Sequence, residues 1–169
     1  MSTTNSNAFN RRVAVARLLR DRGDAEVVTS LGNSTFDFSA TCDRPLSFYL
    51  WGVMGDAAMV GLGMAIAQPK RRVVVVVGDG ELMIALGSLA TIACEKQANL
   101  AFVVLNNELY AETGMQPAHA SRGVDLFGIA RATGCKDVSS VSTGAICGGQ
   151  DINRSESGVA TSLRRSLPA

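Results

Sequence analysis

The sequence predicts an α/β protein whose core is an open parallel β-sheet with helices on both faces. The clearest element is a run of five consecutive valines, Val73–Val77, and a second apolar run follows at Leu100–Leu105. Long β-branched runs are typical of central strands that are covered on both faces, as in a parallel sheet. The segment between them, Leu82–Glu95, has the apolar pattern of a helix, so strands and helices alternate along the chain.

The remaining predicted elements extend this alternation. A helix is expected over 56–68, where nearly every residue is small or apolar, and Pro69 ends it. The shorter predicted elements are an amphipathic helix over 8–22 ended by Gly23, strands over 27–31 and 48–51, a loop at 32–34, a helix over 126–133 ended by Gly134, and a strand over 138–141. Residues 1–141 are therefore predicted to form one domain.

Composition argues against several classes of protein. The net charge is +1 with both signs interspersed, so no nucleic-acid partner is expected. The four cysteines, at positions 42, 94, 135 and 147, show no CxxC spacing, and there is one histidine, which argues against a disulfide framework or a zinc site and favours a reducing compartment such as the cytoplasm. No apolar run is long enough to span a bilayer, and the N-terminus lacks the apolar core of a secretory signal.

Two polar motifs directly follow the two central strands. The tripeptide Gly78–Gly80 (GDG) comes after the valine run, and the pair Asn106–Asn107 comes after the second run, with 25 residues between the motifs. This spacing suits one crossover helix, so both motifs should lie at the same edge of the sheet, where ligands bind in such folds. Asp79 offers a carboxylate oxygen and Asn107 an amide oxygen, a combination that suits magnesium held together with substrate phosphates.

The surroundings of Asp79 favour an anionic ligand. The glycines on either side leave room for a diphosphate to approach the backbone. A helix that begins near Glu81 would direct its free N–H groups toward that anion. The alternative is an ordinary turn in which the side chains of Asp79 and Asn107 cap the backbone.

The motifs resemble the cofactor signature of thiamine-diphosphate-dependent enzymes: GDG, a spacer of this length, then NN. Several segments are similar to one branch of that family, the sulfopyruvate decarboxylase β subunits and the phosphonopyruvate decarboxylases. These segments are Asp43–Pro45, Phe48–Gly55, the LGSLATI run Leu86–Ile92 and the loop Thr113–Gln116. The resemblance covers about residues 9–140. It implies the thiamine-diphosphate-binding fold, with thiamine diphosphate and Mg²⁺ as cofactors.

The resemblance also implies roles for individual residues. The side chains of Asp79 and Asn107 and the backbone carbonyl of Leu109 are expected to ligate the metal. The carbonyl of Gly52 is expected to contact the aminopyrimidine of the cofactor. Met54 occupies the position of a bulky apolar wedge that keeps the cofactor bent, although a core methionine is the alternative.

Four polar residues after the NN pair are candidates to face the substrate: Tyr110, Glu112, Gln116 and His119. Of these, Glu112 and His119 are the predicted catalytic residues; the alternative for His119 is an ordinary surface histidine. The residue after GDG is often small and polar in the family, whereas here it is Glu81. A carboxylate beside a diphosphate is repulsive, so the side chain of Glu81 is expected to point outward.

A second polypeptide is implied as well. In this family a glutamate on a separate pyrimidine-binding domain activates the cofactor, and this chain has no room for that domain. A partner subunit is expected to supply it, in a hetero-oligomer with the cofactor at the interface. The expected reaction is decarboxylation of a 3-substituted 2-oxo acid such as sulfopyruvate or phosphonopyruvate. The alternatives are a subunit of a carboligase or another thiamine-dependent lyase, and a non-catalytic cofactor-binding subunit.

Residues 142–169 depart from the family pattern, which usually closes with a helix and an apolar strand. This segment contains Gly144, the pair Gly148–Gly149 and scattered Ser and Arg residues, and no apolar run like that at 73–77. We expect either a divergent, disordered tail that leaves the sheet without its last strand, or a chain that is truncated or altered in reading frame.

Overall fold

The computed structural model describes residues 11–20, 22–135, 137–141 and 160–163. The helices are α1 (Arg11–Arg20), α2 (Asn33–Cys42), α3 (Ala57–Ala67), α4 (Asp79–Ile84), α5 (Gly87–Glu95) and α6 (Leu126–Ala132), with short 3₁₀ helices η1 (Ala111–Thr113) and η2 (Ala120–Arg122). The strands are β1 (Glu26–Thr29), β2 (Ser47–Tyr49), β3 (Val73–Gly78), β4 (Leu100–Leu105), β5 (Leu109–Tyr110), β6 (Gln116–Pro117), β7 (Val138–Val141) and β8 (Ala160–Leu163).

The main sheet confirms the predicted fold class. Its strand order is β2-β1-β3-β4-β8-β7, and the first four strands pair parallel with one another. The valine run forms β3 and the second apolar run forms β4, as predicted. Strand β8 pairs antiparallel with both β4 and β7, so four residues of the predicted tail join the sheet. The rest of that tail, 142–159 and 164–169, lies outside the described residues.

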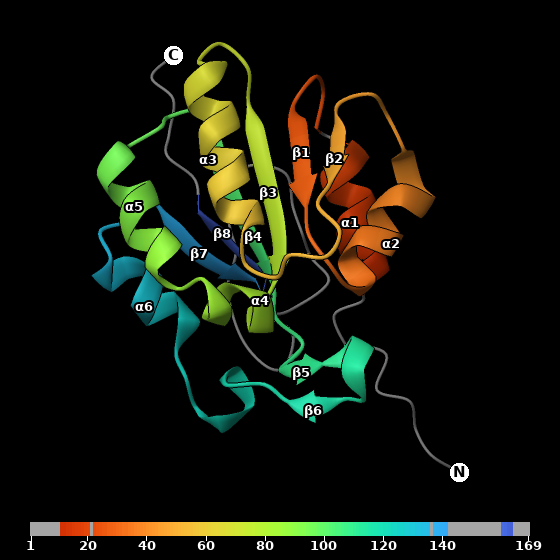
Figure 1. The fold of residues 1–169 in the computed structure, drawn as a ribbon, viewed down its shortest axis with the longest axis vertical. Coiled ribbons are helices and arrows are strands. Elements are labelled where there is room, and N and C mark those ends of the chain that lie inside the picture. Colours follow the sequence, from red (N-terminus) through yellow and green to blue (C-terminus); the bar gives the residue numbers. More distant parts are fainter. Residues whose placement is uncertain (1–10, 21, 136, 142–159, 164–169) are drawn as a thin grey trace.

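Helices cover both faces of the sheet (Figure 1). The valines of β3 alternate between the two faces. Val73, Val75 and Val77 pack in one cluster with apolar residues of α3, α5 and α6. Val74 and Val76 pack on the opposite face with residues of α1 and α2. A strand with both faces covered must be apolar throughout, which explains the unbroken valine run.

The predictions for two segments, 82–95 and 32–34, are wrong. The predicted helix over 82–95 is two helices, because the backbone leaves the helical region at Ala85 (φ −110°, ψ 40°) and α5 begins anew at Gly87. The predicted loop at 32–34 is the start of helix α2, which begins at Asn33. The sequence of α2 has few strong helix formers, so contacts with the rest of the fold stabilise it. One such contact is the Thr35 hydroxyl, which donates to the Ser30 carbonyl at 2.6 Å.

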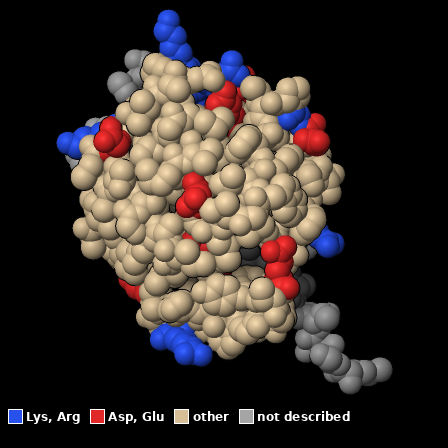
Figure 2. Space-filling model, viewed as in Figure 1, with Lys and Arg blue, Asp and Glu red and all other residues tan. Residues whose placement is uncertain are grey.

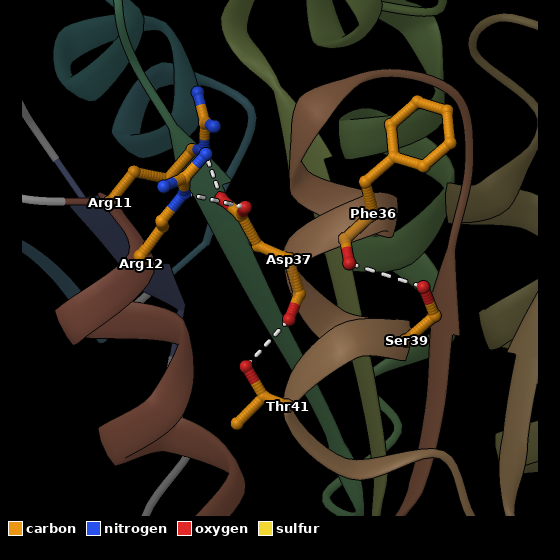
Figure 3. A network of polar contacts seen from close by, with 6 residues as sticks. All are labelled: Arg11, Arg12, Phe36, Asp37, Ser39 and Thr41. Atoms are coloured by element: carbon orange, nitrogen blue, oxygen red, sulfur yellow. Dashed lines mark hydrogen bonds and ion pairs between the residues drawn. The ribbon is translucent and has the colours of Figure 1, made fainter.

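A polar network joins α1 to α2 and centres on Asp37 (Figure 3). The buried carboxylate of Asp37 accepts from Nε of Arg11 at 2.5 Å and lies 3.4 Å from Nε of Arg12. The side chain of Arg11 is 31% exposed and that of Arg12 is 80% exposed, so solvent screens the second pair strongly.

We expect Asp37→Ala to lower the free energy of unfolding by about 2 kcal/mol, because it removes a hydrogen-bonded partner of a charged group. Arg12→Ala should change it by less than about 0.5 kcal/mol, because that pair is exposed. Urea unfolding of both variants checks this. Equal losses of unfolding free energy in the two variants would contradict our assignment of the stabilisation to the ion pair between Arg11 and Asp37.

Charged side chains of both signs are scattered singly over the face seen in Figure 2, with wide uncharged areas between them. Within the described residues, no helix is both long and apolar enough to cross a membrane.

Candidate functional site

A cavity of about 340 Å³ opens at the edge of the sheet where the parallel strands end. Its lining comes from three successive strand ends: 31–34 after β1, 78–81 at the end of β3, and 105–113 at the end of β4. Arg11 and Met54 complete it. The GDG and NN motifs therefore lie at the same edge, as the parallel topology predicts.

Asp79 and Asn107 are brought together by the register of the two central strands. Gly78 pairs with Leu105, so the residues that follow emerge side by side. The backbone N–H of Asn107 donates to Oδ1 of Asp79 at 3.4 Å. Asp79 is 2% exposed, and its Oδ2 is buried without a hydrogen-bond partner among the described residues.

Burial raises the pKa of Asp79 above its ordinary value of 3.8, while the N–H of Asn107 acts in the opposite direction. A buried polar group without a partner costs about 1–3 kcal/mol. A cation bound at Oδ2 would offset this cost. The arrangement therefore fits a site whose carboxylate is completed by a ligand.

The two asparagines also form the turn that the alternative interpretation predicts. Oδ1 of Asn106 accepts from the N–H of Glu108 at 3.0 Å, and Oδ1 of Asn107 accepts from the N–H of Leu109 at 3.1 Å. Glu108 adopts a left-handed backbone conformation with φ 63°. An amide oxygen has two lone pairs, so this turn leaves Oδ1 of Asn107 able to accept a second partner.

The two glycines of GDG have different roles. A Cβ on Gly78 would meet nothing within 4 Å, which agrees with the predicted room for a ligand. A Cβ on Gly80 would overlap the ring of Tyr110. The prediction assigned Gly80 only to leaving space beside a diphosphate. The structure shows that Gly80 also allows the Asn106–Thr113 loop to pack against it.

Glu81 points inward, so the prediction that it turns outward is wrong. Glu81 is 3% exposed, and its Oε1 accepts from the N–H of Gly55 at 3.2 Å. Burial raises its pKa, whereas the Ser30 hydroxyl and the N–H groups of Gly55 and Gly78 oppose that rise. The prediction considered only repulsion by a diphosphate; it could not include a donor from the distant segment around Gly55.

The other predicted site residues are divided between the cavity and its surroundings. Met54, Glu112 and Leu109 line the cavity. Gly52 is exposed in a left-handed conformation with φ 92° and is not part of the lining. His119 is exposed outside the lining, with its Nδ1 3.4 Å from the hydroxyl of Tyr110. Of the two predicted catalytic residues, Glu112 is part of the cavity wall and His119 is not.

The oxygen donors present fit a magnesium–diphosphate group better than a metal held by protein side chains alone. In the part of the chain that the structure describes, no cluster of three or more His, Cys, Asp or Glu residues could hold a metal ion. Asp79 offers one carboxylate, while Asn107 and Leu109 add an amide and a backbone carbonyl. Magnesium commonly uses one or two carboxylates and completes its coordination with phosphate oxygens and water.

Sequence reasoning missed the part of the cavity formed by 31–34 and by Arg11. Residues 31–34 follow β1, the neighbour of β3, so the rule that ligands bind beyond the carboxyl ends of parallel strands could have identified them. Arg11 reaches the cavity because Asp37 holds it. That contact joins residues 26 positions apart, and no local pattern predicts it.

Comparison with known proteins identifies the family of the chain. Residues 30–154 match the family model described as the thiamine pyrophosphate enzyme, C-terminal TPP binding domain. The chain is 43% identical over 129 residues to the phosphonopyruvate decarboxylase of Streptomyces viridochromogenes, covering 76% of this chain and 32% of that protein. It is 39% identical over 126 residues to the sulfopyruvate decarboxylase subunit beta of Methanothermobacter thermautotrophicus, covering 75% of this chain and 67% of that protein.

Solved structures support the fold. A thiamin diphosphate-dependent enzyme from Mycobacterium smegmatis superposes with a TM-score of 0.67 at 24% identity, over 82% of this chain and 28% of that chain. The thiamine diphosphate-dependent 4-hydroxybenzoylformate decarboxylase of Rhodococcus jostii RHA1 gives a TM-score of 0.62 at 20% identity, over 79% of this chain and 28% of that chain. The chain belongs to the thiamine pyrophosphate enzyme family, as a C-terminal-type TPP-binding domain homologous to the sulfopyruvate and phosphonopyruvate decarboxylases.

Proposed function

We propose that this chain is the diphosphate-binding subunit of a thiamine-diphosphate- and Mg²⁺-dependent decarboxylase acting on a 3-substituted 2-oxo acid such as sulfopyruvate or phosphonopyruvate. The observation that carries the proposal is the buried, unpartnered Oδ2 of Asp79 beside the NN turn. Homology to the two kinds of decarboxylase supports the substrate class.

Different residues of the chain would bind the metal and the cofactor. The Asp79 carboxylate, the Asn107 amide oxygen and the Leu109 carbonyl would hold the magnesium. When bound, thiamine diphosphate supplies the electron sink that decarboxylation of a 2-oxo acid requires. Met54 would contact the cofactor from the cavity wall. Gly52 lies outside the lining, so its carbonyl would accept a hydrogen bond from the aminopyrimidine where the cofactor extends beyond the cavity.

Glu112 and His119 are proposed to act on the substrate side. Glu112 lines the cavity and is exposed, so its carboxylate can approach a bound substrate. His119 is linked to the cavity through the hydroxyl of Tyr110, and Tyr110 itself lines the cavity.

A partner subunit completes the proposed enzyme. The chain spans 32% of the length of the phosphonopyruvate decarboxylase and 67% of the sulfopyruvate decarboxylase β subunit that it matches. The proposed reaction also requires a pyrimidine-binding domain with the glutamate that activates the cofactor. We propose that a separate polypeptide provides it, with the cofactor held at the interface.

The test combines binding and turnover. We expect calorimetry to detect thiamine diphosphate binding to the full chain in the presence of Mg²⁺, and chelation of Mg²⁺ by EDTA to abolish it. Addition of a pyrimidine-domain subunit encoded by a neighbouring reading frame should then release carbon dioxide from sulfopyruvate or phosphonopyruvate. Pyruvate serves as the control substrate without the 3-substituent.

The outcomes separate the candidate functions. Binding without carbon dioxide release from any 2-oxo acid in the presence of the partner would identify a non-catalytic or carboligating subunit. Absence of Mg²⁺-dependent binding in both the chain and its complex would contradict the proposed function.

A further inference from the structure

The connection between β2 and α3 is fixed at two points on either side of Met54. The hydroxyl of Ser30 donates to the carbonyl of Val53 at 3.1 Å. The N–H of Gly55 donates to Oε1 of Glu81 at 3.2 Å. The residue between these two anchors, Met54, lines the cavity. The two hydrogen bonds therefore hold the one apolar side chain that this connection presents to the site.

Both anchoring side chains are buried. Ser30, at the end of β1, is fully buried, and Glu81, in the first turn of α4, is 3% exposed. Gly55 is buried in a left-handed conformation with φ 101°, and a Cβ there would lie 2.8 Å from Cβ of Ala85. These contacts connect the segment around Met54 to buried residues of β1, α4 and their surroundings, and α4 lies beside the segment in Figure 1.

A carboxylate is an unfavourable choice if the only requirement is to fill space at this position. Oε2 of Glu81 is buried without a hydrogen-bond partner among the described residues, and the cavity already contains the carboxylate of Asp79. An apolar residue of similar volume would fill the same space without burying an oxygen that has no hydrogen-bond partner. The contribution of Glu81 is instead the acceptor oxygen that it presents to Gly55.

We propose that Glu81 is a positioning residue that, with Ser30, holds the Val53–Gly55 segment so that Met54 projects into the cofactor cavity. This inference rests on the proposed function, since it assigns to Met54 a contact with bound thiamine diphosphate. Glu81 itself contacts neither the cofactor nor the metal in this proposal. It acts through the N–H of Gly55.

Two substitutions of similar size separate positioning from packing. Glu81→Gln keeps an acceptor oxygen for the N–H of Gly55, whereas Glu81→Met removes it. In the full chain without cofactor, hydrogen exchange of the Gly55 amide should be about tenfold faster in Glu81→Met than in wild type and nearly unchanged in Glu81→Gln. Urea unfolding should find both variants folded, with Glu81→Met less stable than Glu81→Gln, because the buried N–H of Gly55 loses its acceptor.

Cofactor binding provides the second readout. With thiamine diphosphate and Mg²⁺ as the probe, calorimetry should give about tenfold weaker binding for Glu81→Met and binding within about twofold of wild type for Glu81→Gln. Ser30→Ala, which removes the other anchor, should weaken binding in the same direction as Glu81→Met. It also keeps the test valid if Glu81→Met does not fold.

The outcomes distinguish this inference from the proposed function. If wild type binds the cofactor and both Glu81→Met and Ser30→Ala bind it equally well, the positioning role is overturned while the proposed function stands. If Glu81→Gln is as impaired as Glu81→Met, the charge of Glu81 and not its acceptor oxygen matters, and the inference is also overturned. If wild type binds no cofactor, the proposed function fails and the positioning role fails with it.

Discussion

Asp79→Asn is expected to weaken Mg²⁺-dependent binding of thiamine diphosphate by about 100-fold, because it removes a charged ligand of the metal. Asparagine retains an Oδ1 that can accept from the N–H of Asn107, so the local turn should persist. Calorimetric titration of the full chain at fixed Mg²⁺ measures the effect. Glu108→Gln is the matched control, because it removes one negative charge from an exposed residue of the same cavity.

The same substitution should stabilise the protein without cofactor. Burial raises the pKa of Asp79 in the folded state above the ordinary value of 3.8, so the folded state binds the proton more tightly than the unfolded state does. Wild type therefore loses stability as the pH rises from the ordinary pKa through the raised one. Above that range, Asp79→Asn should have a free energy of unfolding about 1 kcal/mol greater than wild type.

Urea unfolding across pH measures this gain, which should disappear as the pH falls to 3.8 or below. Tighter cofactor binding in Asp79→Asn than in Glu108→Gln would contradict the ligand role. A lower free energy of unfolding for Asp79→Asn than for wild type at neutral pH would contradict the cost that we assign to the unpartnered Oδ2 of Asp79.

Gly61→Ala is expected to lower the free energy of unfolding by about 2 kcal/mol, the cost of overpacking a close-packed core. Gly61 is buried on α3, and a Cβ there would overlap Cγ2 of Val75 on β3. Val75 is β-branched and fully buried, so it cannot rotate away easily. Helix α3 would have to move off the sheet, and it follows directly after the Met54 connection.

Gly63→Ala is the matched control for this change. It lies on the same helix, is exposed, and a Cβ there would meet nothing within 4 Å. Replacing a glycine by alanine at an exposed position inside a helix should raise the free energy of unfolding by about 0.5–1 kcal/mol. In a Val75→Ala background, Gly61→Ala should lower the free energy of unfolding by less than it does in wild type, because the Cγ2 that its Cβ would overlap is absent. Similar unfolding free energies for Gly61→Ala and Gly63→Ala would contradict the close contact between α3 and β3.

The central part of the fold was predictable because its physical causes are local. An unbroken valine run favours a strand covered on both faces, and a helical segment between two such runs favours parallel strands. From that topology alone, Asp79 and Asn107 had to emerge at the same edge, and the register of Gly78 with Leu105 confirms it.

The parts that could not be predicted depend on contacts between distant segments. Helix α2 has a weak intrinsic preference for helix and is stabilised by the Asp37–Arg11 pair. The inward orientation of Glu81 depends on the N–H of Gly55, 26 residues away along the chain. Both are interactions that no periodic pattern in the sequence encodes.

The most direct test of the central claim is a crystal structure of the full chain with thiamine diphosphate and Mn²⁺, in which the anomalous signal of manganese locates the metal. We predict one metal ion about 2.1–2.2 Å from Oδ2 of Asp79, with the Asn107 amide oxygen and diphosphate oxygens among its other ligands. A metal bound elsewhere, or an Asp79 oxygen that still has no partner when the cofactor is present, would contradict the account.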